Sequence, residues 1–222
     1  MEFSAANFST DSVFISESTY NNKSQTHFAA WLAEQLAPTI FGSKPATLLT
    51  LSNLPHLPLL SWWDFYGKSI LANSCVKIRI MFTCPYRKTV MFYQPKLLER
   101  CLRHPLTKSF FQRQGYSIEK GTEDLLSELS TYFSQSFPHE IGILLGIPLK
   151  DVQGFMGLSK CPLSCRKHWC VYGNPRLSLQ RMNRHRRDQQ QMRNLLRAGI
   201  NPLMLLAQKG QFVYARKKKN SA

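Results

Sequence analysis

The feature that most constrains the fold is a segment in which apolar and polar residues alternate, followed by a turn and a second, mostly apolar segment. Apolar side chains at alternate positions of 76–83 have the period of a half-buried β-strand. Residues 85–88 supply a turn and residues 89–93 return, so the sequence predicts an antiparallel hairpin. A third short strand is expected over 44–51.

Helical periodicity accounts for much of the remaining chain. From Ser24 onward, apolar residues at spacings of three and four predict a helix that Pro38 and Gly42 end. Thr122 is expected to cap a helix over 122–133. Further helices are expected after Pro95, Pro138 and Pro148 and over 181–197, whereas Trp62 and Trp63 are expected in a proline-rich loop.

These elements predict an α+β fold, with a small, mostly antiparallel sheet packed with helices and a helical C-terminal half. The expected organisation is a loose leader at 1–25, a single domain at 26–206 and a basic tail at 207–222. Six cysteines are too sparse for a disulfide scaffold, and the N-terminus lacks the pattern of a secretory signal. No apolar run approaches the ~18 residues of a membrane span, so a cytoplasmic protein is expected.

The positive charge is concentrated near the C-terminus. Of a formal net charge of +16, the last segment, 161–222, carries +13. A nucleic acid or another acidic partner is therefore expected for the 181–197 helix, with a merely solvated helix as the alternative. The candidate polyanion-binding residues are Arg181, Arg184, Arg186, Arg187, Arg193 and Arg197.

Residues 137–155 have the spacing of two short helices joined at a tight corner. Gly142 is expected where the helices touch and Gly146 at the turn, which fits either a helix-turn-helix or a helical hairpin packed into the domain. The second helix would offer Lys150, Asp151 and Gln153 to a groove, and a carboxylate suits phosphates poorly, so the packed hairpin is favoured. The helix-turn-helix interpretation, together with the basic C-terminus, predicts a non-catalytic binding or regulatory protein.

An enzyme or small-ligand-binding protein is the alternative function. Its pocket would gather His139, Glu140 and Lys44, the three candidate catalytic residues. The sequence lacks a phosphate-binding glycine loop, a dinucleotide fingerprint, a zinc-protease motif and a nucleophile elbow, and it names no cofactor.

Three thiols and an imidazole lie close together at Cys161, Cys165, His168 and Cys170. They could form a tetrahedral zinc site in principle, but their spacing is irregular and no second cysteine pair follows. Free thiols are the favoured interpretation, and no metal is assigned.

Three blocks together resemble the uncharacterised bacterial domain-of-unknown-function family 3793, found mainly in Firmicutes. They are Leu-Ala-Pro-Thr-Ile-Phe-Gly-Ser-Lys-Pro-Ala at 36–46, the segment 137–155 and His-Trp-Cys-Val-Tyr at 168–172, within a resemblance that spans about 27–206. Leu36 and Cys170 depart from the family pattern, which has Cys and Lys there, so thiol chemistry is not carried to Leu36. The residues that match the family motifs are Pro38, Lys44, Pro45, Pro138, His139, Glu140, Gly142, Gly146, Pro148, Asp151, Trp169 and Tyr172.

Overall fold

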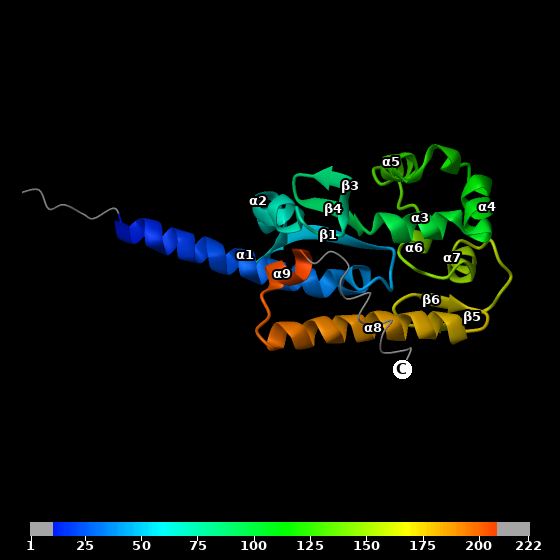
Figure 1. Cartoon of the computed structure of the whole chain (residues 1–222). Coiled ribbons are helices and arrows are strands. Elements are labelled where there is room, and N and C mark those ends of the chain that lie inside the picture. The colour runs from blue at the N-terminus through cyan, green and yellow to red at the C-terminus, as the bar shows by residue number, and fades with distance from the viewer. Residues whose placement is uncertain (1–10, 208–222) are drawn as a thin grey trace, which may run out of the picture.

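The structure is a computed structural model that describes residues 11–207, with side chains from residue 22 onward (Figure 1). It is an α+β fold in which helices surround a four-stranded antiparallel sheet, as the sequence predicts. The elements are α1 (Asp11–Ile40), β1 (Ala46–Leu54), β2 (Leu57–Pro58), α2 (Leu59–Leu71), β3 (Lys77–Cys84), β4 (Arg87–Tyr93), α3 (Pro95–Arg103), α4 (Pro105–Arg113), α5 (Thr122–Tyr132), α6 (Ile141–Leu144), α7 (Leu149–Phe155), β5 (Leu163–Arg166), β6 (Cys170–Tyr172), α8 (Arg176–Arg197) and α9 (Pro202–Ala207).

The sheet has the strand order β2-β1-β4-β3. The predicted hairpin is confirmed, because β3 and β4 pair in antiparallel register around the two-residue turn Pro85–Tyr86. A bulge between Ile80 and Phe82 shifts that register, and β1 pairs with the other side of β4. The predicted strand at 44–51 is therefore central to the sheet, beside β4.

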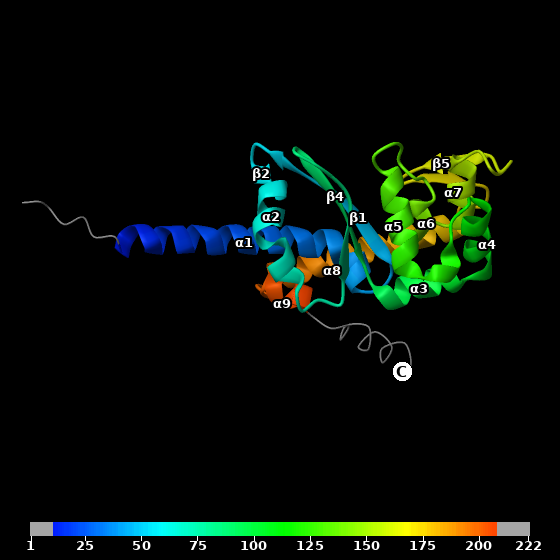
Figure 2. The same cartoon turned by 90° about the horizontal axis from the view of Figure 1, so that it is seen from above.

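The sheet separates two hydrophobic clusters, and β4 contributes to both. Val90 and Phe92 belong to a cluster with α1, α2 and α9, whereas Met91 and Tyr93 belong to a cluster with α3, α4, α5 and α6. Because side chains alternate across a strand, this double burial requires β4 to be apolar at every position from Val90 onward. The helices α3–α7 form the second half of the molecule, beside the sheet (Figure 2).

The first helix begins earlier than the sequence predicts. Helix α1 starts at Asp11 rather than Ser24, so the expected loose leader is wrong for residues 11–25, and residues 1–10 lie outside the described residues. Pro38 lies inside the helix, which ends at Ile40. A proline there removes the N–H that would bond to the carbonyl four residues earlier, and the helix ends two residues later. Of the expected basic tail, Ala207 closes α9 and residues 208–222 lie outside the described part.

The segment expected as a proline-rich loop is in fact the helix α2. Its buried residues include Leu59, Trp63, Tyr66 and Ile70, at the spacings of three and four that define one helix face. Trp63 packs edge-on against Phe92 of the sheet, with ring centroids 5.4 Å apart. Pro58 precedes the helix and therefore does not interrupt it.

Two smaller details of the helix ends also differ. Gly121, not Thr122, is the N-cap residue of α5, and its φ of 114° is a conformation that glycine adopts readily. Helix α8 begins at Arg176, five residues before the expected start, and packs along α1 (Figures 1 and 2). Within residues 11–207, no helix combines the length and apolar character needed to cross a bilayer.

Candidate anion-binding cavity

The corner between α6 and α7 is built as its glycines predict. Gly146 turns the chain with a φ of +83°, a conformation that favours glycine. A Cβ on Gly142 would lie 3.2 Å from Val152 Cγ2 and 3.3 Å from Ile147 Cδ1, so the two helices touch where the glycine stands. The corner is thus a tight, well-packed unit.

The outer face of α7 is covered by β6. A Cβ on Gly154 would lie 2.3 Å from Tyr172 Cγ, and Lys150 Nζ donates to the Tyr172 carbonyl at 2.6 Å. Lys150 and Asp151, which a groove-reading helix would present to DNA, are therefore engaged within the protein. This packing agrees with the packed helical hairpin that the sequence favours.

Asp151 joins α7 to β6 and α8. Its side chain is buried and accepts from Trp169 Nε1 at 2.9 Å, the Tyr172 backbone N–H at 2.9 Å and Ser178 Oγ at 2.5 Å, and it pairs with Lys150 Nζ at 2.6 Å. Burial acts to raise the pKa of Asp151, but hydrogen bonds from Lys150, Ser178, Tyr172 and Trp169 outweigh it and hold that pKa below its ordinary value. Three family-motif positions therefore form one structural cluster, Asp151 with Trp169 and Tyr172.

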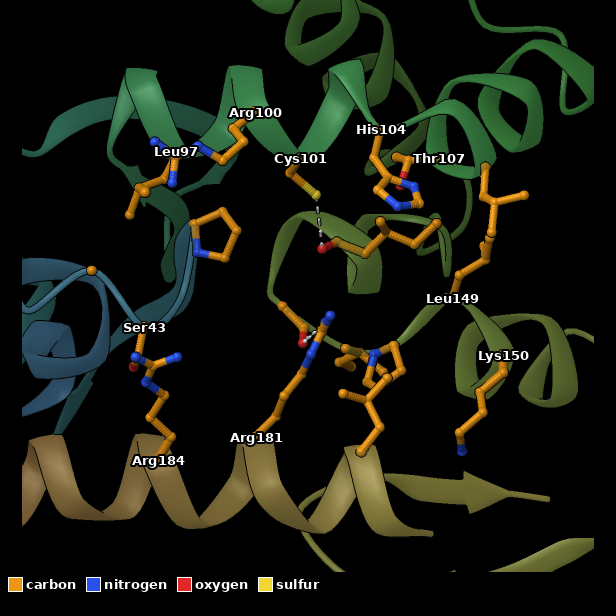
Figure 3. A pocket seen from close by; sticks show the side chains of 18 residues that line it. Ser43, Leu97, Arg100, Cys101, His104, Thr107, Leu149, Lys150, Arg181 and Arg184 are labelled. Atoms are coloured by element: carbon orange, nitrogen blue, oxygen red, sulfur yellow. Dashed lines mark hydrogen bonds between the residues drawn. The ribbon is translucent and has the colours of Figure 1, made fainter. Parts of the chain in front are cut away.

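Next to this cluster is a cavity of about 590 Å³ between α3, the α6–α7 corner and α8 (Figure 3). Three arginines line it, Arg100 from α3 and Arg181 and Arg184 from α8, together with His104 and Lys150. Within the described part of the chain, no Asp or Glu is among its lining residues. The cavity therefore has a strongly positive wall and no internal counter-charge.

The arginines differ in how they are held. Arg181 Nη1 donates to the Gly146 carbonyl at 2.8 Å, which fixes its side chain across the centre of the cavity (Figure 3). Arg100 and Arg184 are exposed, and no carboxylate among residues 22–207 pairs with either of them. Two guanidinium groups are thus open to an anion from outside the protein.

Lys44 and His185 lie behind the cavity wall, on either side of Gly146. Lys44 Cγ is 3.4 Å, and His185 Cε1 3.6 Å, from the position that a Cβ on Gly146 would take. Burial lowers the pKa of Lys44 to about 8. Burial also lowers the pKa of His185 to about 4, assisted by the charges of Lys44 and Arg181 and opposed by a hydrogen bond with the Ser43 backbone. His185 is therefore neutral at pH 7.

The structure does not bring the three candidate catalytic residues together. His139 packs against Phe155, with ring centroids 4.9 Å apart, and lines a second, mainly apolar cavity of about 470 Å³. Glu140 accepts a hydrogen bond from Tyr116 at 2.5 Å, and Lys44 lies beside Gly146. Among the described cavities, none is lined by all three.

The six candidate polyanion-binding arginines of α8 divide into separate groups. Arg181 and Arg184 line the cavity, whereas Arg193 pairs with Glu34 of α1 at 2.6 Å and so joins the two helices. The remaining three are exposed on α8, where Arg186 donates to Asn183 of its own helix; they are Arg186, Arg187 and Arg197. Of these six arginines, one therefore forms an ion pair with α1, two line the cavity, and the three others are exposed on the surface.

All six cysteines lie within the described residues, and no disulfide joins any two of them. Cys161, Cys165, His168 and Cys170 lie on or near the β5–β6 hairpin, where the guanidinium of Arg166 contacts Cys170 Sγ at 3.7 Å. Between residues 22 and 207, no three His, Cys, Asp or Glu side chains are grouped so that they could hold a metal ion.

Sequence reasoning missed two parts of the cavity, Ser43 and Arg100. Ser43 follows α1 and Arg100 lies on α3, and nothing in their local sequence marks either as part of a site. They come near each other because the end of β4 pairs with the start of β1, Tyr93 opposite Ala46, so the start of α3 lies beside the end of α1.

The fold and the site define a small α+β protein with an arginine-lined cavity at the corner of its helical half. The chain belongs to the family described as a protein of unknown function (DUF3793), whose model matches residues 32–206. Neither a curated protein nor a solved structure matches it.

Proposed function

We propose that this protein is a non-catalytic binding protein that holds an anionic ligand in the cavity between α3, the α6–α7 corner and α8. The observation that supports it is the lining: Arg100, Arg181 and Arg184 face one cavity that has no carboxylate in its described walls. Guanidinium groups without a nearby carboxylate repel one another, so a bound anion would stabilise the three arginines around the cavity.

The chemistry of the wall suits a phosphate or carboxylate. A guanidinium presents paired N–H donors that match these groups in a bidentate fashion. Arg181 is already oriented by the Gly146 carbonyl, so less side-chain entropy is lost when it binds a ligand. The cavity volume of about 590 Å³ lies within the range of small-molecule sites.

The groups in the cavity favour binding over catalysis. Burial raises the pKa of Cys101, whose thiol contacts the Ile143 carbonyl at 3.7 Å, so the nucleophilic thiolate is disfavoured. His104 is exposed, and among residues 22–207 no hydrogen bond or ion pair joins its side chain to a second acid or base.

A second candidate function is polyanion binding on the outer face of α8. Arg186, Arg187 and Arg197 are exposed there and would give salt-sensitive contacts with phosphates, without reading sequence. The helix pair α6–α7 has the spacing of a helix-turn-helix but adds little support for nucleic-acid binding. Lys150 and Asp151, which such a motif would present to a groove, contact β6 and α8 instead. We propose a nucleic acid or another acidic polymer as this partner.

Isothermal titration with inorganic pyrophosphate at low salt tests the cavity. We expect the wild type to bind, and Arg184→Gln to weaken binding about 10- to 100-fold, because a hydrogen bond to a charged group contributes about 1.5–3 kcal/mol. Arg187→Gln is the matched control, an exposed arginine on the same helix that does not line the cavity. Absence of binding, or equal loss in both variants, contradicts the proposal.

The same two variants test the polymer function. If a single-stranded oligonucleotide is the partner, Arg187→Gln should weaken its retention and make the salt dependence shallower, whereas the pyrophosphate affinity of that variant stays unchanged. An oligonucleotide that is not retained at low salt would exclude this second candidate.

A further inference from the structure

We infer that the ligand of the arginine-lined cavity is an aliphatic organic acid, with a phosphate or carboxylate head and an alkyl body. This inference rests on the proposed function, because it names the ligand class of the same cavity. It is carried by the aliphatic residues that line the cavity beside its arginines, and by the order of side chains along one face of α8.

The charged end of the cavity lies near the end of α1. Figure 3 shows Ser43 and Arg184 together at one end with Leu97 and Arg100 of α3 across the cavity from them, while His104, Thr107, Leu149 and Lys150 lie toward the other end and Arg181 lies between. A head group at the first end would meet the exposed guanidinium of Arg184 and the Ser43 hydroxyl, with Arg100 on the facing wall.

Helix α8 presents the same order along one face. Leu177, Arg181 and Arg184 stand at spacings of four and three, so they share a face and line the cavity in sequence. The face therefore changes from apolar at Leu177 to cationic at Arg184 over about two helical turns.

Two leucines that line the cavity are exposed to solvent. Leu106 of α4 is 63% exposed and Leu177 is 45% exposed, and both line the cavity. Covering such side chains with an apolar group is favourable in proportion to the area removed from water. A bare phosphate, which is little larger than a few water molecules, would leave most of the cavity unfilled.

The apolar walls are aliphatic rather than aromatic. In the described part of the chain, leucine, isoleucine and proline side chains form these walls, and no Phe, Tyr or Trp lines the cavity. Proteins that hold a nucleobase stack it on an aromatic ring or an arginine guanidinium, whereas an alkyl chain needs only aliphatic contacts. The leucine, isoleucine and proline walls supply such contacts, and comparison with a nucleotide tests the choice.

Titration with a series of alkyl phosphates tests the inference. Methyl, butyl and hexyl phosphate share one head group, and we expect affinity to rise about threefold to fourfold for each methylene that becomes buried, equivalent to about 0.8 kcal/mol. Adenosine monophosphate should bind no more tightly than butyl phosphate. Heptanoate in place of hexyl phosphate shows whether the head group is a carboxylate, and binding of either acid supports the inference.

Two variants assign the alkyl end to its leucines. Leu177→Ser and Leu106→Ser should each lower the affinity for hexyl phosphate at least fivefold and leave that for methyl phosphate within about twofold. Both leucines are largely exposed, so the variants should fold, which circular dichroism checks. Leu158→Ser is the matched control, because Leu158 is 52% exposed and does not line the cavity.

The outcomes separate the two proposals. If pyrophosphate binds but affinity is flat along the alkyl series, or adenosine monophosphate binds best, the aliphatic class is wrong and the anion-binding function stands. If pyrophosphate does not bind the wild type, the proposed function fails, and the inference that rests on it fails too.

Discussion

The indole of Trp169 donates a hydrogen bond of 2.9 Å from Nε1 to Oδ2 of Asp151, across 18 positions of the chain. Asp151 also accepts from Ser178 at the start of α8, so one buried carboxylate joins α7, the β5–β6 hairpin and the helix that carries Arg181 and Arg184. The position of the cavity's arginine wall therefore depends on a residue that does not line it.

Asp151→Asn should lower the free energy of unfolding by about 3 kcal/mol, because it leaves Lys150 and buried donors without their anionic partner. Denaturant unfolding at pH 7 measures this. Asp64→Asn is the control: Asp64 is half-exposed and pairs with Lys88 on the surface, so its loss should cost less than about 1 kcal/mol.

The contribution of Asp151 should also depend on pH. Because its folded pKa lies below the ordinary value of about 3.9, the unfolded chain takes up the proton first as the pH falls. The stability difference between wild type and Asp151→Asn should therefore be constant from pH 5 to 8 and shrink below about pH 4. A difference that shrinks between pH 8 and 6 would contradict this assignment.

His185 predicts a second, separate pH window. Its pKa of about 4 in the folded state lies below the value of about 6.5 in an unfolded chain, so acidification protonates the unfolded state first. Between pH 7 and 4.5 the wild type should lose about 2 kcal/mol more stability than His185→Gln. The charges that face this imidazole belong to Lys44, Arg181 and His168.

Gly154→Ala should be strongly destabilising, because the new Cβ would lie 2.3 Å from Cγ of Tyr172. We expect a loss of about 3 kcal/mol or more in the free energy of unfolding. Gly157→Ala has open space but a φ of +72°, and should cost only about 1–2 kcal/mol. If the clash is the cause, combining Gly154→Ala with Tyr172→Ala should cost less than the sum of the two single changes.

Thiol labelling reports on the cavity directly. With iodoacetamide at pH 7.5, the exposed Cys161 should react at least about tenfold faster than Cys101, whose pKa is raised by burial. Peptide mass spectrometry measures both rates, and denaturant should bring them close together. Saturating hexyl phosphate should slow Cys101 further and leave Cys161 unchanged, because Cys101 alone of the two lines the cavity.

The parts of the fold that follow from the sequence are those with local signals. Alternation over 76–83 marked the β3–β4 hairpin, and Gly142 and Gly146 marked the α6–α7 corner. Helix α2 had a helical spacing at Leu59, Trp63 and Ile70, but the nearby prolines favoured a loop. The extension of α1 back to Asp11 lacked any apolar period to indicate it.

The site was only half predictable. Arg181 and Arg184 were expected on a basic helix, yet nothing local indicated that they, and not Arg193, line a cavity. Pairing with Glu34 takes Arg193 out of the candidate set, and that contact spans 159 positions. Ser43 and Arg100 line the same cavity as Arg181 and Arg184 because of tertiary packing. Local sequence patterns do not predict such packing.

The cavity walls come from Ser43, Arg100 and Arg184, which lie in three distant parts of the chain. No short unfolded segment can hold these groups in place, so a ligand that occupies the cavity binds the folded state alone. By mass action, such a ligand at 100 times its dissociation constant would add about 2.7 kcal/mol to the free energy of unfolding. The melting temperature of the whole chain would then rise with ligand concentration, so a library of acids can be ranked without any assay of activity.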